Sequence, residues 1–138
     1  MRTIDVKEVT ALVKQLCMDA NYYLPADIRQ SFVKGREQEK SPLGREIFDE
    51  MLRNCDLAAQ NAVPICQDTG FAIIFAEVGQ DVHFTGGDFE AAVNEGVRQG
   101  YTDGYLRKSI VCDPLRRVNT DDNTPAVLYT RIVPGDQV

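Results

Sequence analysis

No apolar run in the sequence approaches the roughly 18 residues that a membrane-spanning helix needs. Residues 1–5 also lack the apolar stretch of a secretory signal. Positive charge is scarce: 15 Lys and Arg residues stand against 21 Asp and Glu residues, for a net charge of −6. A nucleic-acid-binding protein normally carries a basic patch. These absences predict a cytoplasmic protein with no membrane span and no nucleic-acid partner.

Paired metal-binding cysteines are absent too, because none of the four cysteines belongs to a C-x-x-C motif. A self-contained zinc or ferredoxin-type site is therefore not expected. Cys17 and Cys55 fall on apolar helical stripes and are predicted to be buried packing residues. Cys66 could be a nucleophile, a metal ligand or a core residue. The single histidine, His83, lies in a predicted strand, which disfavours a nucleophilic Cys–His pair.

The chain changes character near residue 62. Residues 1–62 follow a helical period, and residues 63–138 mix strand and helix patterns. A length of 138 residues suits one compact unit. The predicted fold class is α+β, or mixed: an α-helical N-terminal region followed by an α/β portion with a small, mixed and incomplete sheet.

Three helices are predicted in the first region. Asp5 has the position and spacing of an N-cap for the first of them. Pro25 suits the start of the second helix, with Ile28, Phe32 and Val33 on its buried face. The charged stretch 34–40 is expected to be a solvated connection, and Ser41-Pro42 to open the third helix.

Strands are predicted at 71–78, as a buried strand, and at 128–133. Residues 81–84 are expected to pair with the first of these strands. A further helix is expected to begin after Asp88 and to end at Gly100. The last strand runs into a turn and looks like half of a hairpin, which suggests that the chain is part of a longer polypeptide.

The most informative motif is Pro64-Ile65-Cys66-Gln67-Asp68-Thr69-Gly70. It places a thiol, an amide, a carboxylate and a hydroxyl before a predicted strand, where polar residues serve either a turn or a site. A turn needs Asp, Thr and Gly but has no need of Cys or Gln. Asp68 could act as a general acid or base if burial tuned its pKa, although Gln67 and Asp68 could also be simple turn formers.

Two further polar clusters follow. Residues 104–109, with the sequence GYLRKS, place Arg107 and Lys108 beside a flexible glycine. This arrangement suits a dicarboxylate or a phosphate, because a guanidinium group binds carboxylates through two parallel hydrogen bonds; a solvated charge pair is the alternative. Residues 119–125, NTDDNTP, are typical of an Asx-rich turn and lack the EF-hand glycine and glutamate.

Together these motifs resemble the class I, iron–sulfur-dependent fumarate hydratases and the related tartrate dehydratases. The resemblance runs from about residue 5 to the end of the chain. Its ordered segments are 64–70, 104–111, 113–115, 117–120 and 122–126. Several motifs in order over most of a chain are a more specific signal than any one of them.

The resemblance implies a hydro-lyase that interconverts malate and fumarate on an oxygen-sensitive 4Fe–4S cluster, whose open iron acts as a Lewis acid. It implies that Cys66 is a cluster ligand. It also implies that Gln67 and Asp68 contact the substrate, that Asp68 takes part in proton transfer, and that Arg107 binds a substrate carboxylate.

The same resemblance implies that the remaining cluster cysteines lie outside this chain, which looks like the N-terminal half of an α subunit. Its partners would be the rest of the α subunit and a β subunit, within a homo-oligomer. The isolated chain would then neither complete a cluster nor turn over substrate. Two alternatives stay open: a tartrate dehydratase, and a non-catalytic regulatory module that binds a dicarboxylate without iron.

Overall fold

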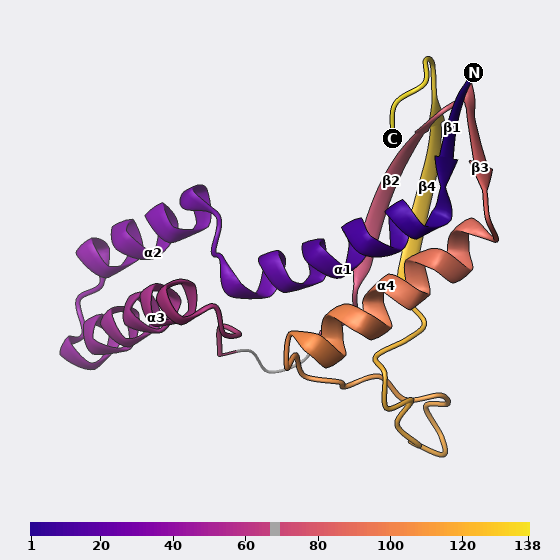
Figure 1. The fold of residues 1–138 in the computed structure, drawn as a ribbon. Helices are drawn as coiled ribbons and strands as arrows, with labels where there is room; N and C mark the ends of the chain where they lie inside the picture. Colours follow the sequence, from indigo (N-terminus) through magenta and orange to yellow (C-terminus); the bar gives the residue numbers. More distant parts are fainter. Residues whose placement is uncertain (67–69) are drawn as a thin grey trace. The chain divides into compact units, whose positions relative to one another are not determined.

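The computed structural model describes residues 1–66 and 70–138, which Figure 1 traces as a ribbon. Contacts along the chain define two compact units, one formed by Met1–Met18 with Asp68–Val138 and the other by Asp19–Gln67. Helices and strands together confirm the mixed α+β class. The boundary near residue 62 marks a change of sequence pattern and stays a prediction. No helix in the described ranges is long and apolar enough to cross a membrane.

The unit Asp19–Gln67 is built on two helices that lie side by side, α2 (Ala26–Gln38) and α3 (Pro42–Asn61) (Figure 1). The Oγ of Ser41 accepts a hydrogen bond from the Gly44 N–H over 3.4 Å. Together with a proline at the first helical position, this cap explains why α3 begins where the sequence predicts. The helix ends at Asn61, and the C-cap residue Ala62, with a left-handed φ of 50°, closes the last turn.

The charged stretch 34–40 is not the expected solvated connection, because α2 continues to Gln38. Apart from Gly35, its residues are good helix formers, and Arg36 forms an ion pair with Asp49 on α3. The expected buried face of α2 is also wrong in part. Ile28 is exposed, and α2 has no fully buried side chain.

The first strand of the other unit, β1 (Arg2–Asp5), pairs in parallel with β3 (Val82–Thr85). The expectation that residues 81–84 pair with 71–78 is therefore wrong. The sequence of β1 is too short to show a strand pattern. Its pairing with β3 could therefore not be predicted. Asp5, the last residue of β1, caps α1 (Val6–Tyr22) as predicted, since its Oδ1 accepts from the Lys7 N–H over 2.9 Å.

A second parallel pair joins β2 (Ile73–Gly79) to β4 (Val127–Val133). Within the described residues β4 pairs with β2, while the hairpin expected from the last strand stays a prediction. The expected mixed sheet takes the form of two separate parallel pairs. Parallel strands need a long crossover, and the chain between β2 and β4 includes α4 (Phe89–Asp103).

The strand β2 is not the buried strand that the sequence predicts. Its side chains alternate, and Phe75 is 78% exposed. Its ring stacks on that of Tyr129 in β4, with centroids 5.2 Å apart. Two residues further along, Arg131 lies 3.4 Å from Glu77. One face of the β2–β4 pair thus carries stacked aromatic rings beside an exposed ion pair.

The core of this unit lies between α1 and α4, where Val93 and Val97 are almost completely buried. A Cβ atom built on Gly96 would lie 2.7 Å from the carbonyl oxygen of Thr10. One built on Gly100 would lie 2.9 Å from Cβ of Cys17. The two glycines therefore allow α4 to approach α1 closely. The prediction that α4 ends at Gly100 is wrong, because this contact lets the helix continue to Asp103.

Candidate functional site

Cys66 lies in the unit Asp19–Gln67, at the end of the segment that follows α3. Its backbone N–H donates to Oδ1 of Asn54 over 2.9 Å, and the preceding Ile65 N–H donates to the carbonyl of Asn21 over 2.8 Å. Two hydrogen bonds thus fix the main chain, while Cys66 itself is exposed. An exposed thiol on an anchored backbone is suited to ligation. Gln67 and Asp68 lie outside the described residues.

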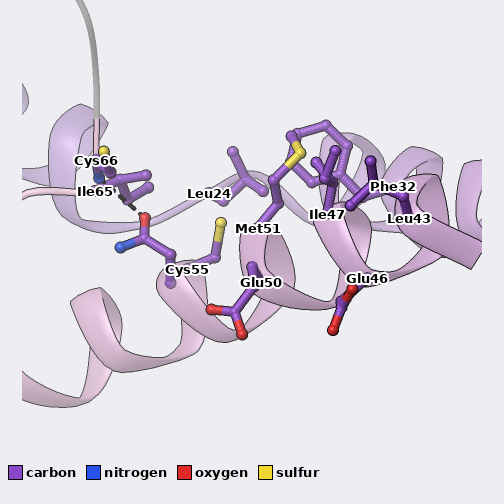
Figure 2. Close-up of a pocket in the computed structure, with 11 residues that line it drawn as sticks. Leu24, Phe32, Leu43, Glu46, Ile47, Glu50, Met51, Cys55, Ile65 and Cys66 are labelled. Atoms are coloured by element: carbon purple, nitrogen blue, oxygen red, sulfur yellow. Dashed lines mark hydrogen bonds between the residues drawn. The ribbon is translucent and has the colours of Figure 1, made fainter.

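A groove of 680 Å³ runs along α3 to Cys66 (Figure 2). Most of its wall is apolar, with Ile47 and Met51 of α3 exposed toward it. Glu46 and Glu50 line it as well. Two carboxylates beside an apolar surface would repel a dianion, so the groove itself is not a site for a dicarboxylate substrate.

Arg107 belongs to the other unit, on the segment that follows α4. Leu106 before it and Ile110 after it are buried, whereas Arg107 is exposed. The two apolar residues anchor the segment and leave the guanidinium-bearing side chain at the surface. A cation so placed can bind a carboxylate. Arg107 and Cys66 belong to different units.

The Asx-rich cluster at residues 119–125 also links other segments of the chain, through the side chain of Asn123. Asn123 is fully buried, with 0% of its surface exposed. Its Oδ1 accepts from the N–H groups of Ser109 over 2.8 Å and Ile110 over 3.2 Å. Its Nδ2 donates to the carbonyl of Gly70 over 3.2 Å. Asn123 therefore joins the second polar cluster to the last residue of the Cys66–Gly70 motif.

The loop that carries Asn123 is tied to α4 on either side of that residue. Asp122 accepts from Nε of Arg98 over 3.0 Å, and the Ala126 N–H donates to Oδ1 of Asn94 over 2.8 Å. Burial disfavours the charged form of Asp122, but hydrogen bonds from Thr124 and Arg98 outweigh it and lower the pKa of Asp122 to about 2. Sequence reasoning missed these anchors, since only the Asx-rich composition was visible.

The other cysteines do not complete a metal site. Cys17 and Cys55 are buried, as predicted, and burial raises the pKa of Cys17 to about 11 and that of Cys55 above its ordinary value. No group of three or more His, Cys, Asp or Glu residues in the described part of the chain could hold a metal ion. The described donors therefore do not fit a complete iron–sulfur cluster. Cys66 can offer one thiolate.

Comparison with known proteins identifies the family. The fumarate hydratase (Fumerase) family model matches residues 10–138. A class I, aerobic fumarate hydratase of Escherichia coli K12 is 39% identical over 132 residues, which are 94% of this chain and 24% of that protein. An L(+)-tartrate dehydratase α subunit of Escherichia coli UTI89 is 26% identical over 135 residues, 95% of this chain and 44% of that subunit.

A fumarate hydratase 2 of Leishmania major is 30% identical over 96% of this chain and 24% of that protein. The chain thus spans about a quarter of the length of these fumarate hydratases and less than half of the tartrate dehydratase subunit. The match includes the two segments with Cys66 and Arg107 and confirms the resemblance seen in the motifs. The chain belongs to the fumarate hydratase (Fumerase) family.

Proposed function

We propose that this chain is the N-terminal part of the α subunit of a class I hydro-lyase that interconverts (S)-malate and fumarate. The family match over residues 10–138 carries the proposal. This chain covers 24% of the aerobic fumarate hydratase and 44% of the tartrate dehydratase α subunit, which supports the proposal that it is part of a larger enzyme. The rest of the α subunit and a β subunit are then its partners, in a cytoplasmic homo-oligomer, and the isolated chain is inactive.

Cys66 is proposed to supply one ligand to a 4Fe–4S cluster, with the other ligands outside this chain. Its exposure and its anchored main chain support this role. When bound, such a cluster supplies a Lewis acid for the departing hydroxyl group. The two residues that follow Cys66 in the sequence, Gln67 and Asp68, are proposed to contact the substrate.

Asp68 is further proposed to take part in proton transfer at the substrate. Arg107 is proposed to bind a substrate carboxylate, because its side chain is exposed on a segment that buried neighbours hold in place. A guanidinium group can form two parallel hydrogen bonds to a carboxylate. Charge neutralisation at this position would favour a dianionic substrate over its neutral analogues.

Tartrate dehydration is a second candidate, because tartrate dehydratase α subunits are among the relatives. The identity to them is 26% to 27%, against 39% to the aerobic fumarate hydratase. Fumarate hydration is therefore the preferred reaction. Turnover of malate, fumarate and tartrate by the complete enzyme distinguishes the two.

The test uses anaerobic reconstitution with iron and sulfide of the complete enzyme, of its Cys66→Ser and Cys112→Ser variants, and of this chain alone. Cys112 is the matched control, since it is also an exposed cysteine of this chain. We expect Cys66→Ser to lose the cluster and the hydration of fumarate, and Cys112→Ser to keep both. Full cluster content and activity in Cys66→Ser, or a stoichiometric cluster in the chain alone, would contradict the proposal.

A further inference from the structure

We propose that Asn123 is a positioning residue for the hydratase site, one that holds the backbone at Ser109 and Ile110, just after Arg107, and at Gly70, the last residue of the Pro64–Gly70 motif. The inference rests on the proposed function. Asn123 is fully buried, and its amide group joins three stretches of chain that are far apart in sequence. A turn former at a loop would not need a completely buried side chain with partners in two other segments.

The acceptor side of the amide holds the segment that carries Arg107. Oδ1 receives hydrogen bonds from the N–H groups of Ser109 and Ile110. One residue earlier, the carbonyl of Lys108 accepts from Nδ2 of Asn119 over 2.9 Å. The three residues that follow Arg107, at positions 108–110, are thus all hydrogen-bonded to the same Asx-rich loop. Fixing this backbone limits the positions from which the Arg107 side chain can reach a carboxylate.

The donor side of the amide holds the other segment. Nδ2 donates to the carbonyl of Gly70 over 3.2 Å. Gly70 follows Asp68 by two residues in the chain, so this hydrogen bond restrains the end of the motif that carries the proposed proton-transfer residue. The two sides of one amide therefore act on two different parts of the proposed chemistry.

The chemistry of the position explains why asparagine occupies it. The φ angle of Asn123 is 63°, in the left-handed region that asparagine and aspartate tolerate better than most residues. An aspartate would keep the acceptor and lose the donor, whereas an alanine would lose both. The neighbouring Asp122 and Thr124 are hydrogen-bonded to each other over 2.7 Å, and Asp122 is bonded to Arg98 of α4. The amide is thus carried by a loop that is itself anchored.

The effects of the acceptor Oδ1 and of the donor Nδ2 can be distinguished by comparing Asn123→Asp with Asn123→Ala in the complete enzyme. Asp121→Ala is the matched control, because Asp121 lies in the same loop with a φ of 65° but is exposed. Hydrogen exchange of the Ser109 and Ile110 amides reports on the acceptor side. The values of kcat and KM for fumarate report on the site.

For Asn123→Asp we expect slow exchange at Ser109 and Ile110, a nearly unchanged KM, and a kcat lower by about tenfold or more, since small misplacements of reacting groups cost this much. For Asn123→Ala we expect fast exchange at both amides, the same loss in kcat, and a KM higher by about tenfold. Asp121→Ala should match the parent in exchange and in both constants.

A merely structural Asn123 would lower stability in both variants and leave kcat and KM of the folded enzyme unchanged, which would overturn the proposal. If Asn123→Ala does not fold, Asn123→Asp still decides, because a parent-like kcat in that variant contradicts the donor role. If the parent enzyme turns over neither malate, fumarate nor tartrate, the proposed function fails. In that case unchanged exchange at Ser109 and Ile110 in Asn123→Ala would separately refute the backbone restraint.

Discussion

Nε of Arg98 lies 3.0 Å from Oδ2 of Asp122, which joins the middle of α4 to the loop that leads into β4. The carboxylate also accepts from the N–H and the hydroxyl of Thr124 over 3.0 and 2.7 Å. All three contacts favour the ionised form. The loop that carries Asn123 therefore depends on the charge of the residue that precedes it.

This charge makes stability depend on acid pH. The pKa of Asp122 is lowered to about 2 in the folded protein, against about 4 in an unfolded chain. Its contribution is therefore complete above pH 4 and is lost as the pH falls toward 2. We expect the free energy of unfolding of Asp122→Asn at pH 6 to be lower by about 2 kcal/mol, with the difference disappearing near pH 2.

Denaturation with urea between pH 2 and pH 6 measures this difference. Asp121→Asn is the control, because it removes the same charge from the same loop and leaves the contact between Arg98 and Asp122 intact. A gap between the parent and Asp122→Asn that is constant across this pH range would show that the ion pair is not the source of the effect.

Replacement of Arg107 tests the proposed carboxylate contact. Hydrogen bonds to charged groups contribute roughly 1.5–3 kcal/mol, so Arg107→Ala is expected to raise KM for fumarate about 10- to 100-fold. Arg107→Lys keeps the charge but not the planar fork and should give a smaller increase. Steady-state kinetics of the complete enzyme provide the measurement.

Arg116→Ala is the control for Arg107, since Arg116 is also exposed and lies in the same part of the chain. Its removal changes the net charge equally. An equal rise of KM in Arg116→Ala would mean that general electrostatic attraction, and not a specific contact with Arg107, favours the substrate.

The close approach of α1 and α4 predicts that Gly96→Ala destabilises the protein, although alanine is the better helix former. Alanine gains about 1 kcal/mol in helix propensity. Its Cβ would, however, lie 2.7 Å from both the Thr10 carbonyl oxygen and the Val13 Cβ, and such overpacking costs about 1–3 kcal/mol. We expect a net loss of about 1 kcal/mol in the free energy of unfolding. A gain in stability would contradict the packing.

The control for Gly96→Ala is Thr102→Ala, at an exposed position of the same helix. Here no neighbour is crowded, so the change should be within about 0.5 kcal/mol of the parent. Urea denaturation of the two variants at the same pH separates packing from helix propensity.

The helix starts were predictable from sequence because their causes are local. Ser41 and Asp88 cap α3 and α4 through hydrogen bonds to residues three positions ahead. Such a signal needs no knowledge of the rest of the fold. The same holds for Cys17 and Cys55, whose place on an apolar stripe was enough to predict burial.

Strand pairing and the role of Asn123 were not predictable in this way. The pairing of β1 with β3 brings together residues 80 positions apart, and no local pattern encodes that choice. Asn123 looks like any turn residue in the sequence, because its partners Ser109 and Gly70 are distant in the chain. The residue types alone left alternatives open for Cys66 and Arg107, and the roles of both in one site were implied by the family resemblance.

The parallel pairing of β1 with β3 also sets an order in which the molecule can fold. Arg2 pairs with Val82, which lies 80 positions further along the chain. The unit Asp19–Gln67, by contrast, is one continuous stretch, and a short connection joins its two helices. Contacts between distant residues form more slowly than local ones. The helices α2 and α3 can therefore pack together before β1 pairs with β3. During that interval its unpaired backbone groups are a template for other chains, which makes the N-terminal strand a point of vulnerability to misassembly.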